Sequence, residues 1–174
     1  STAIQIIPHV AQQAKHLTIF QRTAKYSLPA RNGPLPEDVR AAHKKKYREL
    51  REQAYFTPFG IAGYPPPEKG AIEATPEERD AKYHAKWAEG GTISYLFSYT
   101  DLLLSEESNK TASDFVRERI RDIVKDPATA ELLCPNDHPI GTKRICLDSG
   151  YYETFNRDNV SLVDVRSAPI EGIT

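Results

Sequence analysis

Two pairs of adjacent residues in this 174-residue chain have side chains suited to binding negative charge. Arg22 and Thr23 closely follow an apolar run rich in β-formers, His16 to Phe20, and Lys143 and Arg144 end the stretch GTKR. An arginine offers a permanently charged, planar row of donors for a phosphate or an oxyanion, whereas a lysine supplies a point charge. A threonine hydroxyl can add a neutral donor. Both pairs therefore indicate anion binding.

Arg22 stands where a dinucleotide-binding βαβ unit selects its cofactor. In such a unit a glycine-rich turn opens a helix that binds the pyrophosphate, and the next strand ends near the ribose about twenty residues later. An acidic residue there favours NAD, whereas an arginine accommodates the 2′-phosphate of NADP. No acidic residue lies between Ala3 and Arg22. Ser1, Thr2 and Ala3 would then be the last positions of the turn, where small residues let backbone amides approach the pyrophosphate.

Each pair also has a plainer interpretation. A strand-end arginine often makes an ordinary surface ion pair, and adjacent cations in a loop are usually solvated. Neighbouring residues of an extended loop point in opposite directions, so Lys143 and Arg144 could also serve different partners. The spacing alone leaves these alternatives open.

The elements that must position these residues fall into three regions. Residues 1–34 predict a helix, a buried strand and an irregular loop, residues 35–134 are almost wholly helical in pattern, and residues 135–174 predict turns and a strand from Val160 to Val165. A helical block that interrupts two α/β-like ends is typical of an insertion into a sheet domain.

Start signals divide the helical block. Four signals each mark the first turn of a helix: proline with acidic residues, a capping box at Thr75 to Glu78, Ser105, and Asp126-Pro127. The predicted helices run from about residue 35 to 54, 76 to 88, 93 to 104, onward from 105, and 127 to 133. Tyr83 and Trp87 could line a substrate channel, but core packing is the commoner role of such aromatic residues.

Charge and composition exclude several classes of protein. Lys+Arg 23 against Asp+Glu 24 gives a net charge of −1, which argues against a general nucleic-acid binder. No apolar run has the length of a membrane span, and the histidines show no metal-ligand spacing. Two cysteines too far apart for a C-x-x-C site predict free thiols and, by default, a cytoplasmic location. The opening residues read as a helix already under way, so we expect a piece of a longer protein.

Three segments together resemble the type I Baeyer–Villiger monooxygenases, which are FAD- and NADPH-dependent flavoproteins similar to the cyclohexanone and phenylacetone monooxygenases. The segments are LTIFQRTAKYSLPARNGPL, GTKRICLDSGYYETFNRDNVSLVDV and APIEGIT. The resemblance implies an α/β fold, part of a Rossmann-like NADP-binding domain interrupted by an all-helical insertion. Residues 1–34 and 135–174 would belong to the NADP-binding domain, and residues 35–134 would form the insertion. Ala24 departs from the proline that many relatives carry.

The resemblance also implies roles for single residues. In the NADP turn and the helix start it places Ser1, Thr2, Ala3 and Gln5. In the 2′-phosphate site it places Arg22, Thr23 and Lys143. Arg144 falls on the active-site arginine, a catalytic and cofactor-binding residue that in the family faces the flavin and stabilises the peroxyflavin and the ketone adduct. A fixed cation suits that role because it favours the anionic form of the peroxide.

The implied activity is insertion of one oxygen atom of O2 next to a ketone carbonyl, giving an ester or a lactone. FAD and NADPH would be the cofactors, a small ketone and O2 the reactants, and the FAD domain of the same parent chain the protein partner, without nucleic acid or membrane. These 174 residues alone would be inactive. Two alternatives remain: another FAD/NADPH monooxygenase that hydroxylates nitrogen, and a non-catalytic helical interaction module.

Overall fold

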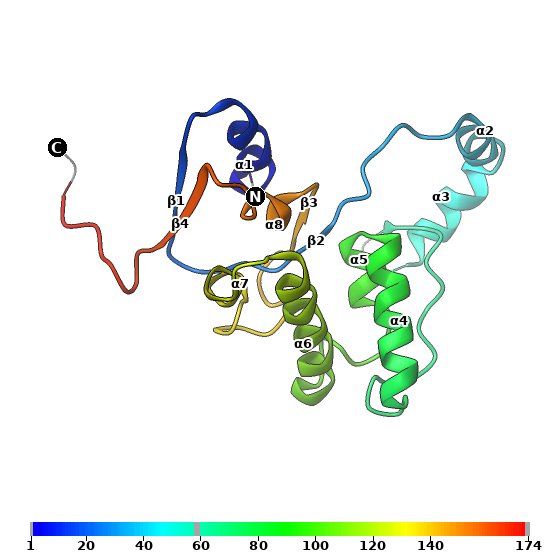
Figure 1. Cartoon of the computed structure of the whole chain (residues 1–174). Coiled ribbons are helices and arrows are strands. Elements are labelled where there is room, and N and C mark those ends of the chain that lie inside the picture. Colours follow the sequence, from blue (N-terminus) through cyan, green and yellow to red (C-terminus); the bar gives the residue numbers. More distant parts are fainter. Residues whose placement is uncertain (1, 58–59, 173–174) are drawn as a thin grey trace. The chain divides into compact units, whose positions relative to one another are not determined.

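The computed structural model describes residues 2–57 and 60–172, and Figure 1 shows the path of the chain. Its elements are α1 (Thr2–Gln13), β1 (Leu17–Gln21), β2 (Ser27–Pro29), α2 (Glu37–Lys45), α3 (Tyr47–Tyr55), α4 (Pro76–Glu89), α5 (Thr92–Leu96), α6 (Glu106–Ile123), α7 (Pro127–Leu133), β3 (Cys146–Asp148), α8 (Tyr151–Thr154) and β4 (Val160–Asp164). This mixed content confirms the α/β class. Among the described helices, none is long and apolar enough to cross a membrane.

Contacts divide the chain into two compact units. The larger unit comprises residues 1–31 and 68–174, and the smaller unit comprises residues 32–67. All the strands and α1, α4, α5, α6, α7 and α8 belong to the larger unit, whereas α2 and α3 belong to the smaller one. The division into residues 1–34, 35–134 and 135–174 stays a prediction.

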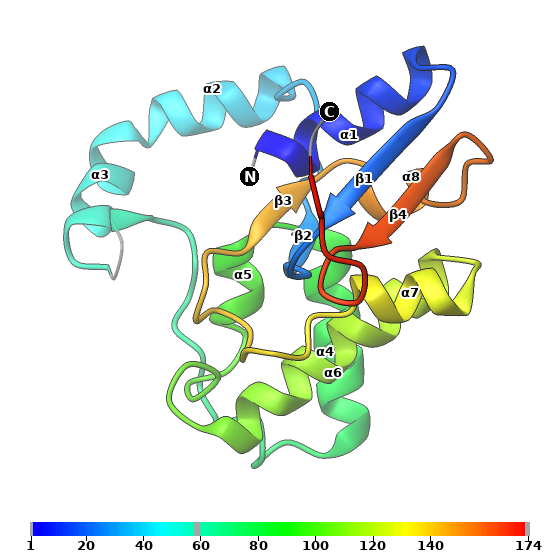
Figure 2. The same ribbon diagram turned by 90° about the vertical axis from the view of Figure 1, so that its left-hand side faces the viewer.

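The strands form two parallel pairs that join distant parts of the sequence. β1 pairs with β4, from Leu17 opposite Val160 to Gln21 opposite Asp164. β2 pairs with β3, from Ser27 opposite Cys146 to Pro29 opposite Asp148. Parallel strands cannot be joined by a tight turn, so the helices occupy the long connections between them. The carboxyl ends of β1 and β4 consequently lie side by side (Figure 2).

Helix α1 runs back along β1, so its amino-terminal end lies at the end of the sheet where β1 and β4 finish (Figure 2). The predicted apolar stripe is only partly buried: Ile4 and Ala11 are buried, Ile7 is half-buried and Val10 is 37% exposed. The expectation of a buried first strand was wrong. Phe20 is 61% exposed, because its side of the two-stranded pair faces away from the described core.

An aromatic cluster forms the core beside α4, α5 and α6. The Tyr83 ring centroid lies 5.6 Å from that of Tyr95, 5.7 Å from that of Tyr99 and 5.5 Å from that of Phe115. The Tyr83 and Tyr95 hydroxyls bond to Thr111 Oγ1 and the Ala112 carbonyl, so their polar ends are satisfied. Burial raises the pKa of Tyr83 to about 12. Tyr83 is therefore a core residue, as the commoner interpretation predicted.

The predicted helix over residues 35–54 is divided at Lys46 into α2 and α3. Hydrogen bonding continues across the division, because the Lys46 amide donates to the Ala42 carbonyl at 3.1 Å and the Leu50 amide donates to the Lys46 carbonyl at 2.9 Å. Neither helix contains a buried residue. The predicted α4 capping box is confirmed, since the Thr75 and Glu78 side chains each bond the other's backbone amide.

The predicted helix over residues 93–104 was too long, because α5 ends at Leu96. Tertiary hydrogen bonds replace the helical ones beyond it. The Asp101 carboxylate accepts the Ala71 amide at 2.8 Å and the Ser108 hydroxyl at 2.6 Å. The Leu102 carbonyl accepts the Asn109 side-chain amide at 2.8 Å. These bonds hold residues 101–105 as a turn that leads into α6.

Strands β2 and β3 were missed because each has only three residues and the first contains a proline. Pro29 is the last residue of β2, where a missing backbone donor is tolerated. The pair is stabilised from its sides instead: the Ser27 hydroxyl donates to the Asp148 carboxylate at 2.5 Å, and the Ser27 amide donates to the Tyr152 hydroxyl at 3.2 Å.

Gly90→Ala should destabilise the fold, because a Cβ at Gly90 would lie 2.5 Å from Arg31 Cγ and 2.6 Å from the Pro29 carbonyl oxygen. Gly91→Ala is the matched control: both glycines have positive φ (80° and 85°), but a Cβ at Gly91 meets nothing within 4 Å. We expect Gly90→Ala to be less stable than Gly91→Ala by about 2 kcal/mol in denaturant unfolding. Equal stability of the two variants would contradict this close approach.

Candidate cofactor-binding site

A pocket of about 120 Å³ lies where β1 and β4 end. Its walls come from three segments: the residues that follow β1, the residues that follow β4, and the segment of α7 and the loop after it. The lining residues are Gln21, Arg22, Thr23, Ala24, Glu131, Leu132, Cys134, Asn136, Asp137, Asp164 and Arg166. Parallel pairing of β1 with β4 thus brings Arg22, Thr23 and Arg166 to one edge of the sheet.

Arg166 and Asp137 together connect two of the predicted phosphate-binding residues, Thr23 and Lys143. The Nη2 atom of Arg166 donates to Thr23 Oγ1 and to Asp137 Oδ2, both at 3.1 Å. Lys143 Nζ lies 3.8 Å from the same Asp137 oxygen. Arg22 is exposed, and it makes no hydrogen bond or ion pair with any residue that the structure describes. Its guanidinium is therefore available to a ligand.

Asp137 is the central anion of this cluster. Three contacts lower the pKa of Asp137 to about 2: a hydrogen bond from His138, a hydrogen bond from Arg166 and the nearby charge of Lys143. The carboxylate is therefore ionised at neutral pH. The His138 side chain is 7% exposed, and its ring packs edge-on against Tyr26 with the centroids 5.3 Å apart. The Asp137 carboxylate is thus hydrogen-bonded to the largely buried ring of His138.

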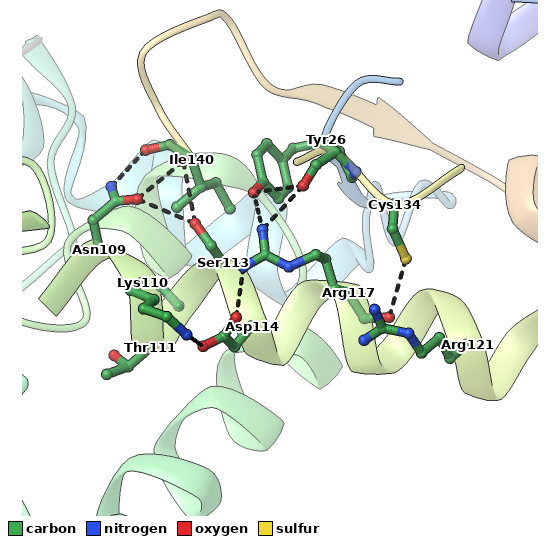
Figure 3. A network of polar contacts seen from close by, with 12 residues as sticks. Tyr26, Asn109, Lys110, Thr111, Ser113, Asp114, Arg117, Arg121, Cys134 and Ile140 are labelled. Atoms are coloured by element: carbon green, nitrogen blue, oxygen red, sulfur yellow. Dashed lines mark hydrogen bonds and ion pairs between the residues drawn. The ribbon is translucent and has the colours of Figure 1, made fainter. Parts of the chain in front are cut away.

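Helix α6 holds the loop that carries these residues, as Figure 3 shows. The Asn109 side chain donates to the Ile140 carbonyl at 2.8 Å and accepts the Ile140 amide at 3.0 Å. The Ser113 hydroxyl also lies 3.3 Å from the Ile140 amide. Asn109 is 6% exposed, so these hydrogen bonds are shielded from solvent water. Both backbone groups of Ile140 are consequently fixed by α6 just before the GTKR stretch.

Two arginines continue the same contact along α6. Arg117 Nη1 donates to the Tyr26 hydroxyl at 2.8 Å and to the Pro135 carbonyl at 3.0 Å (Figure 3). Arg121 forms an ion pair with Glu131 on α7. The four α6 residues that bind residues 131–140 are therefore spaced by four, at positions 109, 113, 117 and 121, which is one stripe of a helix.

Glycine is required just before the two cations. Gly141 has a φ of 89°, and a Cβ there would lie 2.6 Å from Leu103 Cδ2. Lys143 and Arg144 are both exposed, and the buried Ile145 and Cys146 follow at the start of β3. Within residues 2–57 and 60–172, Arg144 has no hydrogen-bond or ion-pair partner.

The other predicted residues are not brought into this pocket. Thr2, Ala3 and Gln5 are exposed on the first two turns of α1, and none of them lines the pocket. Ser1 lies outside the described residues. Sequence reasoning missed Arg166 and Asp137. Arg166 is the second residue after β4, as Arg22 is the first after β1, so the same strand-end argument could have found it.

Individual relatives match the chain over its whole length, although no family model matches it. It is 41% identical over 174 residues to the 2-oxo-Δ3-4,5,5-trimethylcyclopentenylacetyl-CoA monooxygenase of Pseudomonas putida, and 41% identical over 179 residues to the cyclohexanone 1,2-monooxygenase of Acinetobacter sp. A Baeyer–Villiger monooxygenase of Pseudooceanicola batsensis is 38% identical over 175 residues. Over its whole length the chain is thus similar to Baeyer–Villiger monooxygenases. Each match covers 100% of the chain and 32% of the relative's length.

Two solved structures share the fold. An oxidised steroid monooxygenase bound to NADP superimposes with a TM-score of 0.93 at 48% identity, covering 99% of this chain and 33% of that one. OTEMO in complex with FAD and NADP superimposes with a TM-score of 0.94 at 40% identity, covering 99% of this chain and 32% of that one.

A phenazine N-monooxygenase of Lysobacter antibioticus is also similar in sequence. It is 34% identical over 175 residues, covering 100% of this chain and 32% of that relative.

Asn109→Ala should destabilise the protein, because it leaves the Leu102 carbonyl and both Ile140 backbone groups without this partner. We expect a loss of about 2–3 kcal/mol, since buried polar groups would be left unsatisfied. Lys110→Ala is the control on the neighbouring position, where the side chain is 72% exposed and pairs only with Asp114. Denaturant unfolding of both variants checks the difference, and an equally small loss in both would contradict it.

Proposed function

We propose that this chain is the NADPH-binding portion of a flavin-dependent Baeyer–Villiger monooxygenase. One observation carries the proposal: the chain matches an NADP-bound steroid monooxygenase at 48% identity across 99% of its length. The parent protein would insert one oxygen atom of O2 beside a ketone carbonyl, producing an ester or a lactone. Residues 1–34 and 135–174 would form its NADP-binding domain and residues 35–134 the helical insertion, in a cytoplasmic protein.

The residues present fit the 2′-phosphate of NADPH. Arg22 is exposed with an uncommitted guanidinium, and Thr23 lies next to it at the end of β1. Two further cations, Arg166 and Lys143, both lie close to the Asp137 carboxylate. A phosphate dianion suits such a group because arginine binds it with several charge-assisted hydrogen bonds. Thr2, Ala3 and Gln5 would lie near the pyrophosphate, since the amino-terminal end of a helix favours negative charge.

Arg144 would act on the reacting groups. FAD, held by the FAD domain of the same parent chain, would supply the redox chemistry with O2 and NADPH. Arg144 is exposed, and its guanidinium offers a planar row of N–H donors. It can therefore stabilise negative charge that develops on oxygen, while Lys143, the preceding residue, turns to the 2′-phosphate.

A second candidate is oxidation of a nitrogen atom by the same cofactors. The relationship to a phenazine N-monooxygenase, 34% identical over 175 residues, favours this alternative. The product distinguishes the two reactions, because a ketone gives an ester or a lactone, whereas an amine gives a hydroxylamine and a heteroaromatic nitrogen gives an N-oxide. A purely non-catalytic helical module is disfavoured, because the match extends over the strands as well as the helices.

Arg22→Ala in the parent protein should weaken NADPH far more than NADH, because only NADPH carries the 2′-phosphate. Loss of a charge-assisted hydrogen bond is worth about 2 kcal/mol, or roughly thirtyfold in affinity. Dissociation constants of both dinucleotides, measured by titration, check this. Arg40→Ala is the control, because Arg40 is an exposed arginine of α2 that pairs with Glu37. An equal loss for NADPH and NADH would remove the 2′-phosphate assignment.

Arg144→Ala in the parent protein should leave flavin reduction by NADPH largely intact and nearly abolish ester formation. Removing a group that stabilises developing oxyanion charge costs about 10²–10³ in rate. Anaerobic reduction followed by absorbance measures the first step, and product analysis with a ketone measures the whole reaction. Lys143→Ala is the comparison, with weaker NADPH binding as its main effect. Near-normal ester formation by Arg144→Ala would show that Arg144 lacks this role.

A further inference from the structure

We propose that Asp137 is a positioning residue for the 2′-phosphate of the dinucleotide. Its carboxylate pairs with the Arg166 guanidinium, which lies beside Thr23, and with the Lys143 ammonium, so that both cations face the phosphate when it binds. This inference rests on the proposed function, because it assumes that the pocket receives the 2′-phosphate of NADPH.

The geometry shows one oxygen shared by two cations. Arg166 Nη2 lies 3.1 Å from Asp137 Oδ2, and Lys143 Nζ lies 3.8 Å from the same atom. The two cations come from different segments, one after β4 and the other in the GTKR stretch. Asp137 is therefore the residue that joins them.

Asp137 itself is held by the core. Its other oxygen, Oδ1, bonds to His138 Nδ1, and the His138 ring lies edge-on against Tyr26. The Tyr26 hydroxyl bonds in turn to Arg117 of α6 and to the Pro135 carbonyl. A continuous chain of contacts thus runs from α6 to the carboxylate, which fixes its direction although its side chain is 29% exposed.

The two cations need such a partner. The Arg166 side chain is 55% exposed and the Lys143 side chain is 41% exposed, so each would otherwise sample many rotamers in water. Their like charges would also repel each other in the empty site. Asp137 offsets this repulsion and restricts both side chains before the ligand arrives.

Donors for the phosphate remain free in this arrangement. Arg166 uses one nitrogen, Nη2, for both Thr23 and Asp137, whereas its guanidinium has five N–H groups. Thr23 Oγ1 accepts the bond from Arg166, so its hydroxyl hydrogen is free to donate. The carboxylate therefore orients the cations without consuming the groups that a phosphate would bind.

The experiment measures dissociation constants of NADP⁺ and NAD⁺ for the full-length parent protein and three variants. Asp137→Asn keeps the size of the side chain and removes its charge, and Asp137→Glu restores the charge. Glu37→Gln is the control, because Glu37 is an exposed carboxylate of α2 that also pairs with an arginine, Arg40, and does not line the pocket. Thermal unfolding and flavin content of each variant are compared with those of the wild type.

Asp137→Asn should weaken NADP⁺ about tenfold, the size expected when a supporting carboxylate of an ion site is lost. NAD⁺ binding should change by less than about twofold, since NAD⁺ has no 2′-phosphate. Asp137→Glu should recover part of the loss, and Glu37→Gln should behave like the wild type.

Tighter NADP⁺ binding by Asp137→Asn would overturn the inference, because the carboxylate would then compete with the phosphate. Equal weakening of NADP⁺ and NAD⁺ would also overturn it, since a general structural defect would be the cause. A wild-type protein without preference for NADP⁺ over NAD⁺ would overturn the proposed function itself and the inference with it.

Discussion

The buried amide of Asn109 is the contact on which the arrangement of the cations depends. It binds the carbonyl of Leu102 and both backbone groups of Ile140, and so connects the start of α6 with the segment that leads to GTKR. Unsatisfied backbone groups in a core are costly, so the loop has a strong preference for this one path. The helices between the strand pairs therefore do more than enlarge the protein, because α6 sets the position of Lys143 and Arg144.

The strand pairs supply the second constraint. Segments about 140 residues apart become neighbours when β1 pairs with β4, which is why the residues after each strand share one pocket. Among the described residues Arg22 has no partner, whereas Arg166 pairs with Asp137, so the site combines an unpaired cation with a paired one.

The sequence predicted those parts of the fold whose causes are local. The capping box at Thr75, the proline after Asp126 and the apolar run before Arg22 are short-range signals, and the elements there formed as expected. Strands β2 and β3 could not be predicted in this way. Ser27 and Asp148 stabilise each other across the sequence, and three residues carry too little periodicity to show it.

In the candidate site, too, the residues with a local signal were predicted and those that depend on long-range contacts were missed. Arg22, Thr23, Lys143 and Arg144 were found because their types and the family resemblance draw attention to them. Asp137 was missed because an isolated acidic residue in a loop has no distinguishing pattern, and its role depends on Arg166 and His138 being near it in space. Arg166 and Asp137 connect Thr23 with Lys143 in space, whereas the roles of all these residues stay predictions.

The four-residue spacing of the α6 contacts limits how this region can change in evolution or engineering. Positions 109, 113, 117 and 121 bind residues 131–140 through one stripe of the helix. A single insertion within α6 would rotate the later positions by about 100° and move them away from their partners. Recombination between family members should therefore keep α6 and the loop after α7 together as one exchangeable block, with α6 held at constant length.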